Sequence, residues 1–121
     1  MLSVLTALAA SAAMQSSAPV YSVEVLVQDK RGLFGTRSIK VSRDIPLEPG
    51  TFEVEAGSAV LLEGDVTLQG DMVEIDMTIC RPREDPCEVI ATPSISFRMG
   101  AAASIRETNF RSSWEVSFDP E

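Results

Sequence analysis

The chain has 121 residues, which is enough for one domain and little more. Eighteen Asp and Glu residues outnumber ten Lys and Arg residues, so the formal net charge at pH 7 is −8. An acidic balance of this size disfavours binding to nucleic acid or to anionic membrane surfaces. The chain contains no histidine, which excludes any catalytic arrangement that depends on a histidine base.

Residues 1–18 differ in composition from the rest of the chain. They carry no charged side chain and form an apolar run that ends in small residues, a pattern typical of a cleavable signal peptide. Cleavage after Ala12 or after Ala18 fits the small-x-small rule, and we expect the second because a strand pattern follows it. No Lys or Arg precedes the apolar run, which leaves open a start upstream of Met1. The alternative, an Ala-rich helix packed on the domain, would be apolar around its whole circumference.

From Val20 onward, apolar and polar residues alternate in short runs, which is the period of half-buried β-strands. In chain order, the longest apolar series are Tyr21, Val23, Val25 and Val27; Val73, Ile75, Met77 and Ile79; Ile95, Phe97 and Met99; and Trp114, Val116 and Phe118. Shorter series are Ile39 and Val41; Phe52 and Val54; Val60 and Leu62; Val66 and Leu68; and Ala101, Ala103 and Ile105.

Turn-forming residues separate these runs at short intervals. The expected turns are 30–32 with Gly35, 46–50, 56–58, 63–65, 69–71, 81–86, Pro93 and Gly100. We therefore predict one all-β domain over residues 19–121, built as a small β-sandwich or partly open barrel of about eight or nine short antiparallel strands. An α+β domain is disfavoured because no segment shows helical spacing over ten residues.

Cys80 and Cys87 are the two cysteines of the chain, and six residues with two prolines and four charges separate them. An even pair in an exported chain predicts a disulfide, and paired positions of antiparallel strands lie within disulfide range. We therefore expect a hairpin whose stems are joined by a Cys80–Cys87 bridge. A zinc site would need four ligands, and a catalytic thiol pair is usually spaced Cys-x-x-Cys, so both alternatives are disfavoured.

The segment 81–86 between the cysteines is the candidate interaction loop, with Arg81, Arg83, Glu84 and Asp85 as its charged residues. Because a disulfide would hold this loop rigid, little conformational entropy would be lost on binding. A rigid loop with two arginines would suit insertion into a trypsin-like protease.

Every charged residue between positions 44 and 79 is acidic, whereas the charged residues in 30–43 are all basic and follow Asp29. An acidic face of this kind can bind Ca²⁺ or a basic partner. The sequence contains no calcium-loop motif, and outward positions of amphipathic strands must be polar in any case. We interpret these carboxylates as a solvated face.

Residues 92–105 read Thr-Pro-Ser-Ile-Ser-Phe-Arg-Met-Gly-Ala-Ala-Ala-Ser-Ile. This segment resembles a short pattern of small uncharacterised proteobacterial periplasmic β-proteins and of the periplasmic parts of secretin-type outer-membrane channels. The pattern is a Pro, an alternating strand, a Gly and Ala-x-Ile, and it is structural in those proteins. The resemblance implies a Gram-negative periplasm and transfers no functional residue.

Together these features predict a non-catalytic periplasmic or secreted domain that binds another envelope or secreted protein, as an interaction or envelope-assembly module. We expect no catalytic residue, cofactor, metal ligand or nucleic-acid partner, and no transmembrane span in the mature protein. One alternative is a protease inhibitor that presents the loop 81–86. Another is a small hydrolase that uses two carboxylates, although a domain of this size rarely encloses a substrate cleft.

Overall fold

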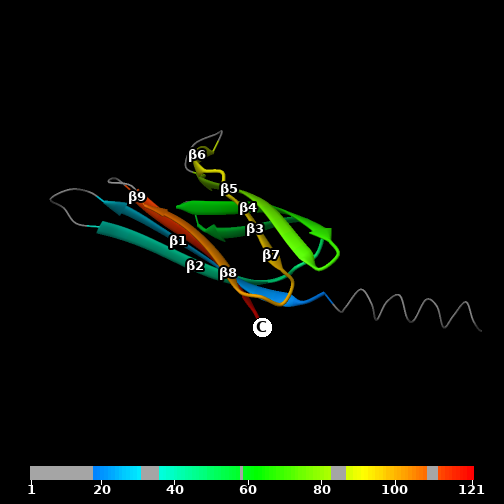
Figure 1. The fold of residues 1–121 in the computed structure, drawn as a ribbon. Helices are drawn as coiled ribbons and strands as arrows, with labels where there is room; N and C mark the ends of the chain where they lie inside the picture. Colours follow the sequence, from blue (N-terminus) through cyan, green and yellow to red (C-terminus); the bar gives the residue numbers. More distant parts are fainter. Residues whose placement is uncertain (1–17, 31–35, 58, 83–86, 109–111) are drawn as a thin grey trace, which may run out of the picture.

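The computed structural model describes residues 18–30, 36–57, 59–82, 87–108 and 112–121. These residues form nine strands and no helix, which confirms the predicted all-β class (Figure 1). Apart from Ala18, the predicted signal peptide lies outside the described residues. The strands are β1 (Val20–Lys30), β2 (Thr36–Pro46), β3 (Gly50–Ala56), β4 (Val60–Gln69), β5 (Met72–Arg81), β6 (Glu88–Ala91), β7 (Ser94–Arg98), β8 (Ala103–Thr108) and β9 (Ser112–Pro120).

The strands form two antiparallel sheets that pack face to face as a β-sandwich, and neither sheet closes into a barrel. Sheet A has the order β2-β1-β9-β8, and sheet B has the order β3-β4-β5, with β6 and β7 both pairing with β5. The chain crosses between the sheets twice, from β2 to β3 and from β7 to β8. In Figure 1, β1, β2 and β9 extend past sheet B on the side of the β1–β2 connection.

The core lies between the two sheets and contains the apolar members of the alternating runs. Among its fully buried side chains are Tyr21, Val23, Val25, Leu47, Val54, Leu62, Val73, Ile75, Ile79, Val116 and Phe118. The Phe97 ring contacts the rings of Tyr21 and Phe118, at centroid distances of 5.8 and 5.7 Å respectively. The period-two pattern therefore identified the inward faces of the main strands correctly.

Strand β4 corrects one predicted turn, because the segment 63–65 continues the strand. Gly64 is buried and lies opposite Phe52 of β3 and Met77 of β5. A Cβ atom at this position would overlap the Phe52 ring, so the glycine makes room for an aromatic side chain from the neighbouring strand. A glycine that signals a turn in the sequence here serves close packing within a sheet.

The fourth strand position of sheet B, next to β5, is divided between β6 and β7 at Thr92 and Pro93. Both segments pair with β5, and the Pro93 carbonyl accepts a hydrogen bond of 2.8 Å from the Met77 amide. Proline has no amide hydrogen to donate to the ladder, so the strand is interrupted at this residue. The predicted break at Pro93 is confirmed.

The crossing from β7 to β8 is held by the side chain of Tyr21. Its hydroxyl accepts a hydrogen bond of 2.7 Å from the Gly100 amide and donates one of 3.0 Å to the Ala101 carbonyl. Met99 and Ala101, which the alternation places in strands, belong to this crossing. The turn begins earlier than expected because the chain must pass from one sheet to the other.

Candidate functional site

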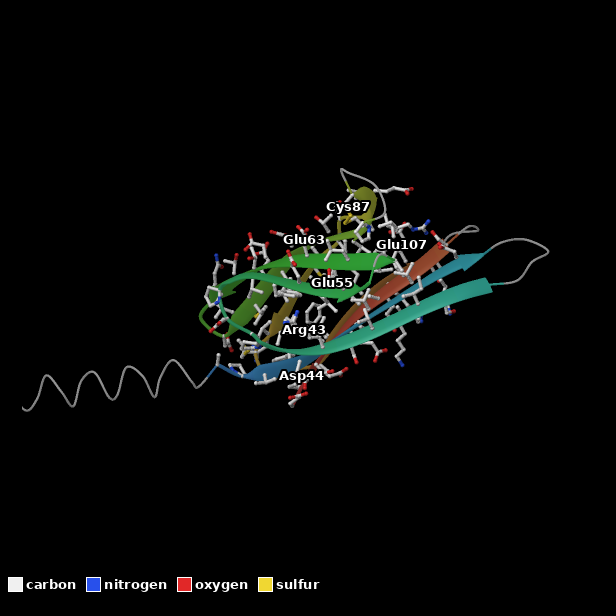
Figure 2. All side chains as sticks on the ribbon, turned by 180° about the vertical axis from the view of Figure 1, so that it is seen from behind. Arg43, Asp44, Glu55, Glu63, Cys87 and Glu107 are labelled. Atoms are coloured by element: carbon white, nitrogen blue, oxygen red, sulfur yellow. A yellow bond between two sulfur atoms is a disulfide. The ribbon has the colours of Figure 1, made fainter. Side chains whose placement is uncertain are left out.

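Cys80 and Cys87 form the predicted disulfide, with their Cα atoms 5.8 Å apart. Cys80 lies in β5 opposite Val89, and Cys87 directly precedes β6. The bridge therefore joins diagonal positions of the two strands. It links β5 to β6, which has only four residues and a shift in its register with β5. Figure 2 shows Cys87 on the side of the molecule away from Arg43 and Asp44.

Arg81 does not belong to the loop in which the sequence analysis placed it. It is the last residue of β5, lies opposite Glu88, and makes an ion pair with Asp29 at the end of β1. The two side chains are 23% and 21% exposed, so the pair is partly shielded from water and links sheet B to sheet A. Arg81 is thus held both by strand pairing in sheet B and by a carboxylate of sheet A. The other candidate loop residues, Arg83, Glu84 and Asp85, lie outside the described residues.

The acidic segment forms the outer face of sheet B. Strand register places Glu53 directly opposite Glu63, and Asp65 directly opposite Asp76. These four exposed carboxylates surround a shallow hollow of about 250 Å³. Within the described residues, no group of three or more His, Cys, Asp or Glu side chains is placed to hold a metal ion. Like charges directly opposite one another weaken a strand pair, so this face lowers the stability of the sheet.

A second carboxyl pair lies on the outer side of β2. A hydrogen bond with Asp44 raises the pKa of the Glu121 carboxyl above its ordinary value, and partial loss of hydration and the charge of Asp44 act in the same direction. The Glu121 amide donates a hydrogen bond of 3.1 Å to the Val20 carbonyl, which fixes this residue beside β1.

On the side of the sandwich between β2 and β3, an arginine joins the two sheets beside a pocket of about 250 Å³. Arg43 lies opposite the buried Val23, on the core-facing side of β2. Its Nη1 donates a hydrogen bond of 3.0 Å to the Glu53 carbonyl in β3 and thereby joins the two sheets. Leu47, in the crossing that follows, is buried and donates its amide to the Pro19 carbonyl at 2.8 Å.

The opposite side of the sandwich, between β6 and β8, contains a groove of about 380 Å³. Its apolar lining comes from both sheets, with Ile90 and Pro93 on sheet B and Ile105 and Trp114 on sheet A. Trp114 is 7% exposed, while Ile90 and Ile105 are half-buried. The groove therefore combines apolar side chains with the polar residues Thr92, Arg106 and Glu107, beside a strand edge.

Glu107 lies on the rim of this groove. It is opposite Trp114 in the strand register, so it occupies a core-facing position of β8, and it is exposed. Figure 2 shows Glu107 on the same side of the molecule as Cys87 and away from Arg43. Within the described part of the chain, no hydrogen-bond or ion-pair partner is found for the Glu107 carboxylate. The two sides of the sandwich thus carry inward-facing charges of opposite sign. Arg43 on one side is hydrogen-bonded to the other sheet, whereas among the described residues Glu107 on the opposite side is not.

The sequence analysis missed both Arg43 and Glu107, although a signal for each is present. Arg43 follows Ile39 and Val41 at the same spacing of two, and Glu107 follows Ala103 and Ile105. A charge that continues an apolar series is the sequence mark of an inward-facing edge residue.

No protein-family model matches the chain, and comparisons with curated proteins and with solved structures give no match either. The segment 92–105 forms Pro93, β7, a turn at Gly100 and β8, which is the strand-turn-strand unit that its sequence predicts. Among the residues that the structure describes, no helix is long and apolar enough to cross a membrane.

Proposed function

We propose that this chain is a non-catalytic, exported protein-binding domain that acts as an interaction or assembly module of the bacterial envelope. The observation that carries the proposal is the open edge of β8 beside the groove between β6 and β8, because an unpaired strand edge next to a surface groove is a common docking site for another polypeptide. The groove is formed by two different sheets, so its shape depends on the folded domain.

The disulfide supports the exported location. Bridges of this kind persist in oxidising compartments such as the bacterial periplasm and are rare in the cytosol. The resemblance of residues 92–105 to periplasmic β-proteins agrees with the same location. We therefore place the proposed partner among periplasmic or membrane-attached envelope proteins.

The two alternative functions have less support. A protease-inhibiting loop would present Arg81 to solvent, but this side chain is paired with Asp29 and lies within a strand. A carboxylate hydrolase would enclose its acids in a cleft, but Glu53, Glu63, Asp65 and Asp76 lie on an exposed sheet face. Neither arrangement matches the chemistry that the function needs.

Crosslinking in living cells of the producing bacterium tests the proposal. A photoreactive amino acid at Ile90, on the groove wall, should yield one defined crosslinked species in the periplasmic or membrane fraction. The matched control places the same group at Thr67, an exposed residue on the outer face of sheet B, and should yield no such species. A protein that stays monomeric and uncrosslinked from every exposed position would contradict the proposal.

A further inference from the structure

We infer that β8 binds an extended segment of the partner by strand addition, and that a Lys or Arg side chain of this segment pairs with Glu107. The inference rests on the proposed function and specifies its surface and the chemistry of its partner. Three features of the β6–β8 side support it: the open backbone edge of β8, the groove beside that edge with apolar residues from both sheets, and the carboxylate on its rim.

The backbone of β8 offers the first feature. β8 is the last strand of sheet A and, among the described residues, pairs with β9 alone. Every second residue of an edge strand directs its amide and carbonyl away from the sheet, where another strand can bind them. An added strand would continue sheet A beyond β8.

The groove offers the second feature, because it receives the side chains of such a strand. Residues of the added strand that face the core would lie beside Ala103, Ile105 and Glu107, which are the core-facing residues of β8. They would also cover Ile90 and Pro93 of sheet B, which line the groove from the other side. Apolar side chains at these positions would complete the sandwich on the side where it is open.

The third feature is the negative charge of Glu107, which favours a basic side chain in the partner. Arg106 also lines the groove, but among the described residues no ion pair joins it to Glu107, and in the strand register it lies opposite Glu115 on the outer face of sheet A. On the other side of the sandwich, the inward Arg43 donates a hydrogen bond across the sheets to the backbone carbonyl of Glu53. A basic side chain in the added strand would supply Glu107 with the opposite charge.

The strand register predicts a sequence pattern for the added segment of the partner. All strand pairs of the domain are antiparallel, and an antiparallel partner would run from Glu107 toward Ala103. Its expected order is therefore basic, any residue, apolar, any residue, apolar. The basic residue lies opposite Glu107 and the first apolar residue opposite Ile105.

A synthetic peptide tests this directly, with acetyl-Thr-Lys-Thr-Val-Thr-Val-Thr-amide as the probe. Trp114 is the single tryptophan of the chain and lines the groove, so its fluorescence reports occupation. We expect a saturable change of Trp114 emission on titration, and at least tenfold weaker binding of the same peptide with Glu in place of Lys.

Charge exchange on the protein supplies the specific control. Glu107→Lys should weaken the Lys peptide at least tenfold and make the Glu peptide the better ligand. Glu63→Lys changes the net charge equally but lies on the outer face of sheet B, so it should leave the preference for the Lys peptide unchanged. If Glu107→Lys does not fold, the affinities of the unaltered protein for the Lys and Glu peptides still test the inference.

Three outcomes would overturn the inference. The first is no change of Trp114 emission with the Lys peptide up to about 1 mM. The second is equal affinity of the protein for the two peptides. The third is self-association of the protein that Glu107→Lys abolishes, because a second copy of the chain would then occupy the groove. Crosslinking in cells separates this inference from the proposed function. A partner that still crosslinks from Ile90 in the Glu107→Lys protein would leave the function standing and remove β8 as its site.

Discussion

Tyr21 joins the two sheets through both its ring and its hydroxyl. Its ring is fully buried beside Phe97, and its hydroxyl serves as both acceptor and donor for the backbone of the β7–β8 crossing. A buried hydroxyl with both bonds satisfied adds stability, and it also orients the turn that leads into β8. The start of the proposed binding strand is thus set by a residue about eighty positions earlier in the chain.

Removal of this hydroxyl should be costly. In Tyr21→Phe, the Gly100 amide and the Ala101 carbonyl lose their partner while the ring stays in place. We expect the free energy of unfolding to fall by about 1–3 kcal/mol, measured by urea titration with an unchanged m-value. Ser22→Ala, one position along on the outer face, should change it by less than about 0.5 kcal/mol. An unchanged midpoint for Tyr21→Phe would show that water replaces the lost bonds.

At the level of strands, β6 is the element with the weakest pairing to its sheet. It has four residues, its register with β5 shifts near Cys80, and Val89 is 57% exposed. The disulfide closes the connection between β5 and β6 into a short ring, and the Arg81–Asp29 pair fastens the end of β5 to sheet A. One wall of the groove is therefore held mainly by crosslinks and less by strand pairing.

Replacement of both cysteines should accordingly affect β6 and the total stability. We expect Cys80→Ala/Cys87→Ala to lose about 2–3 kcal/mol of unfolding free energy, as the chain-entropy model gives for a ring of this size. Hydrogen exchange should accelerate in β6 more than in β4. A reductant should destabilise the native protein by a similar amount and leave the double variant unchanged. If thiol titration confirms reduction but stability does not change, the bridge is not a structural clamp.

At the level of the whole molecule, charge is distributed unevenly between the sheets. The outer face of sheet B carries carboxylates in direct cross-strand opposition, whereas Lys40 and Glu24 on the outer face of sheet A make an ion pair of 3.5 Å. Because the net charge is −8, this repulsion on sheet B has few positive charges to offset it. The acidic face is thus a cost to stability that the hydrophobic core offsets.

Reversal of one charge on this face should stabilise the domain. In Glu63→Lys, the repulsion with Glu53 becomes attraction, and we expect the free energy of unfolding to rise by about 0.5–1 kcal/mol at low salt. The gain should shrink as added salt screens the pair. Glu55→Lys has the same change of charge but lies opposite Leu61, so its gain should be smaller. Equal gains for the two variants would mean that total charge, and not the cross-strand pair, sets the effect.

The sequence alone was sufficient for the features that depend on neighbours along the chain. Period-two alternation identified the inward faces of the strands, and the presence of two cysteines left one possible disulfide. It failed at Gly64 and at Arg81, because a ring on β3 and a carboxylate on β1 determine their conformations. These partners are distant in sequence, so no local pattern reveals them.

The tertiary structure alone decided which strands share a sheet and which edges stay open. The groove between β6 and β8 exists because Ile90 and Ile105 belong to different sheets. Alternation predicts which side chains of a strand face inward, but it does not predict which residues of the other sheet lie opposite them. A strand's own residues determine its two faces, whereas its neighbours are determined by the packing of the whole chain.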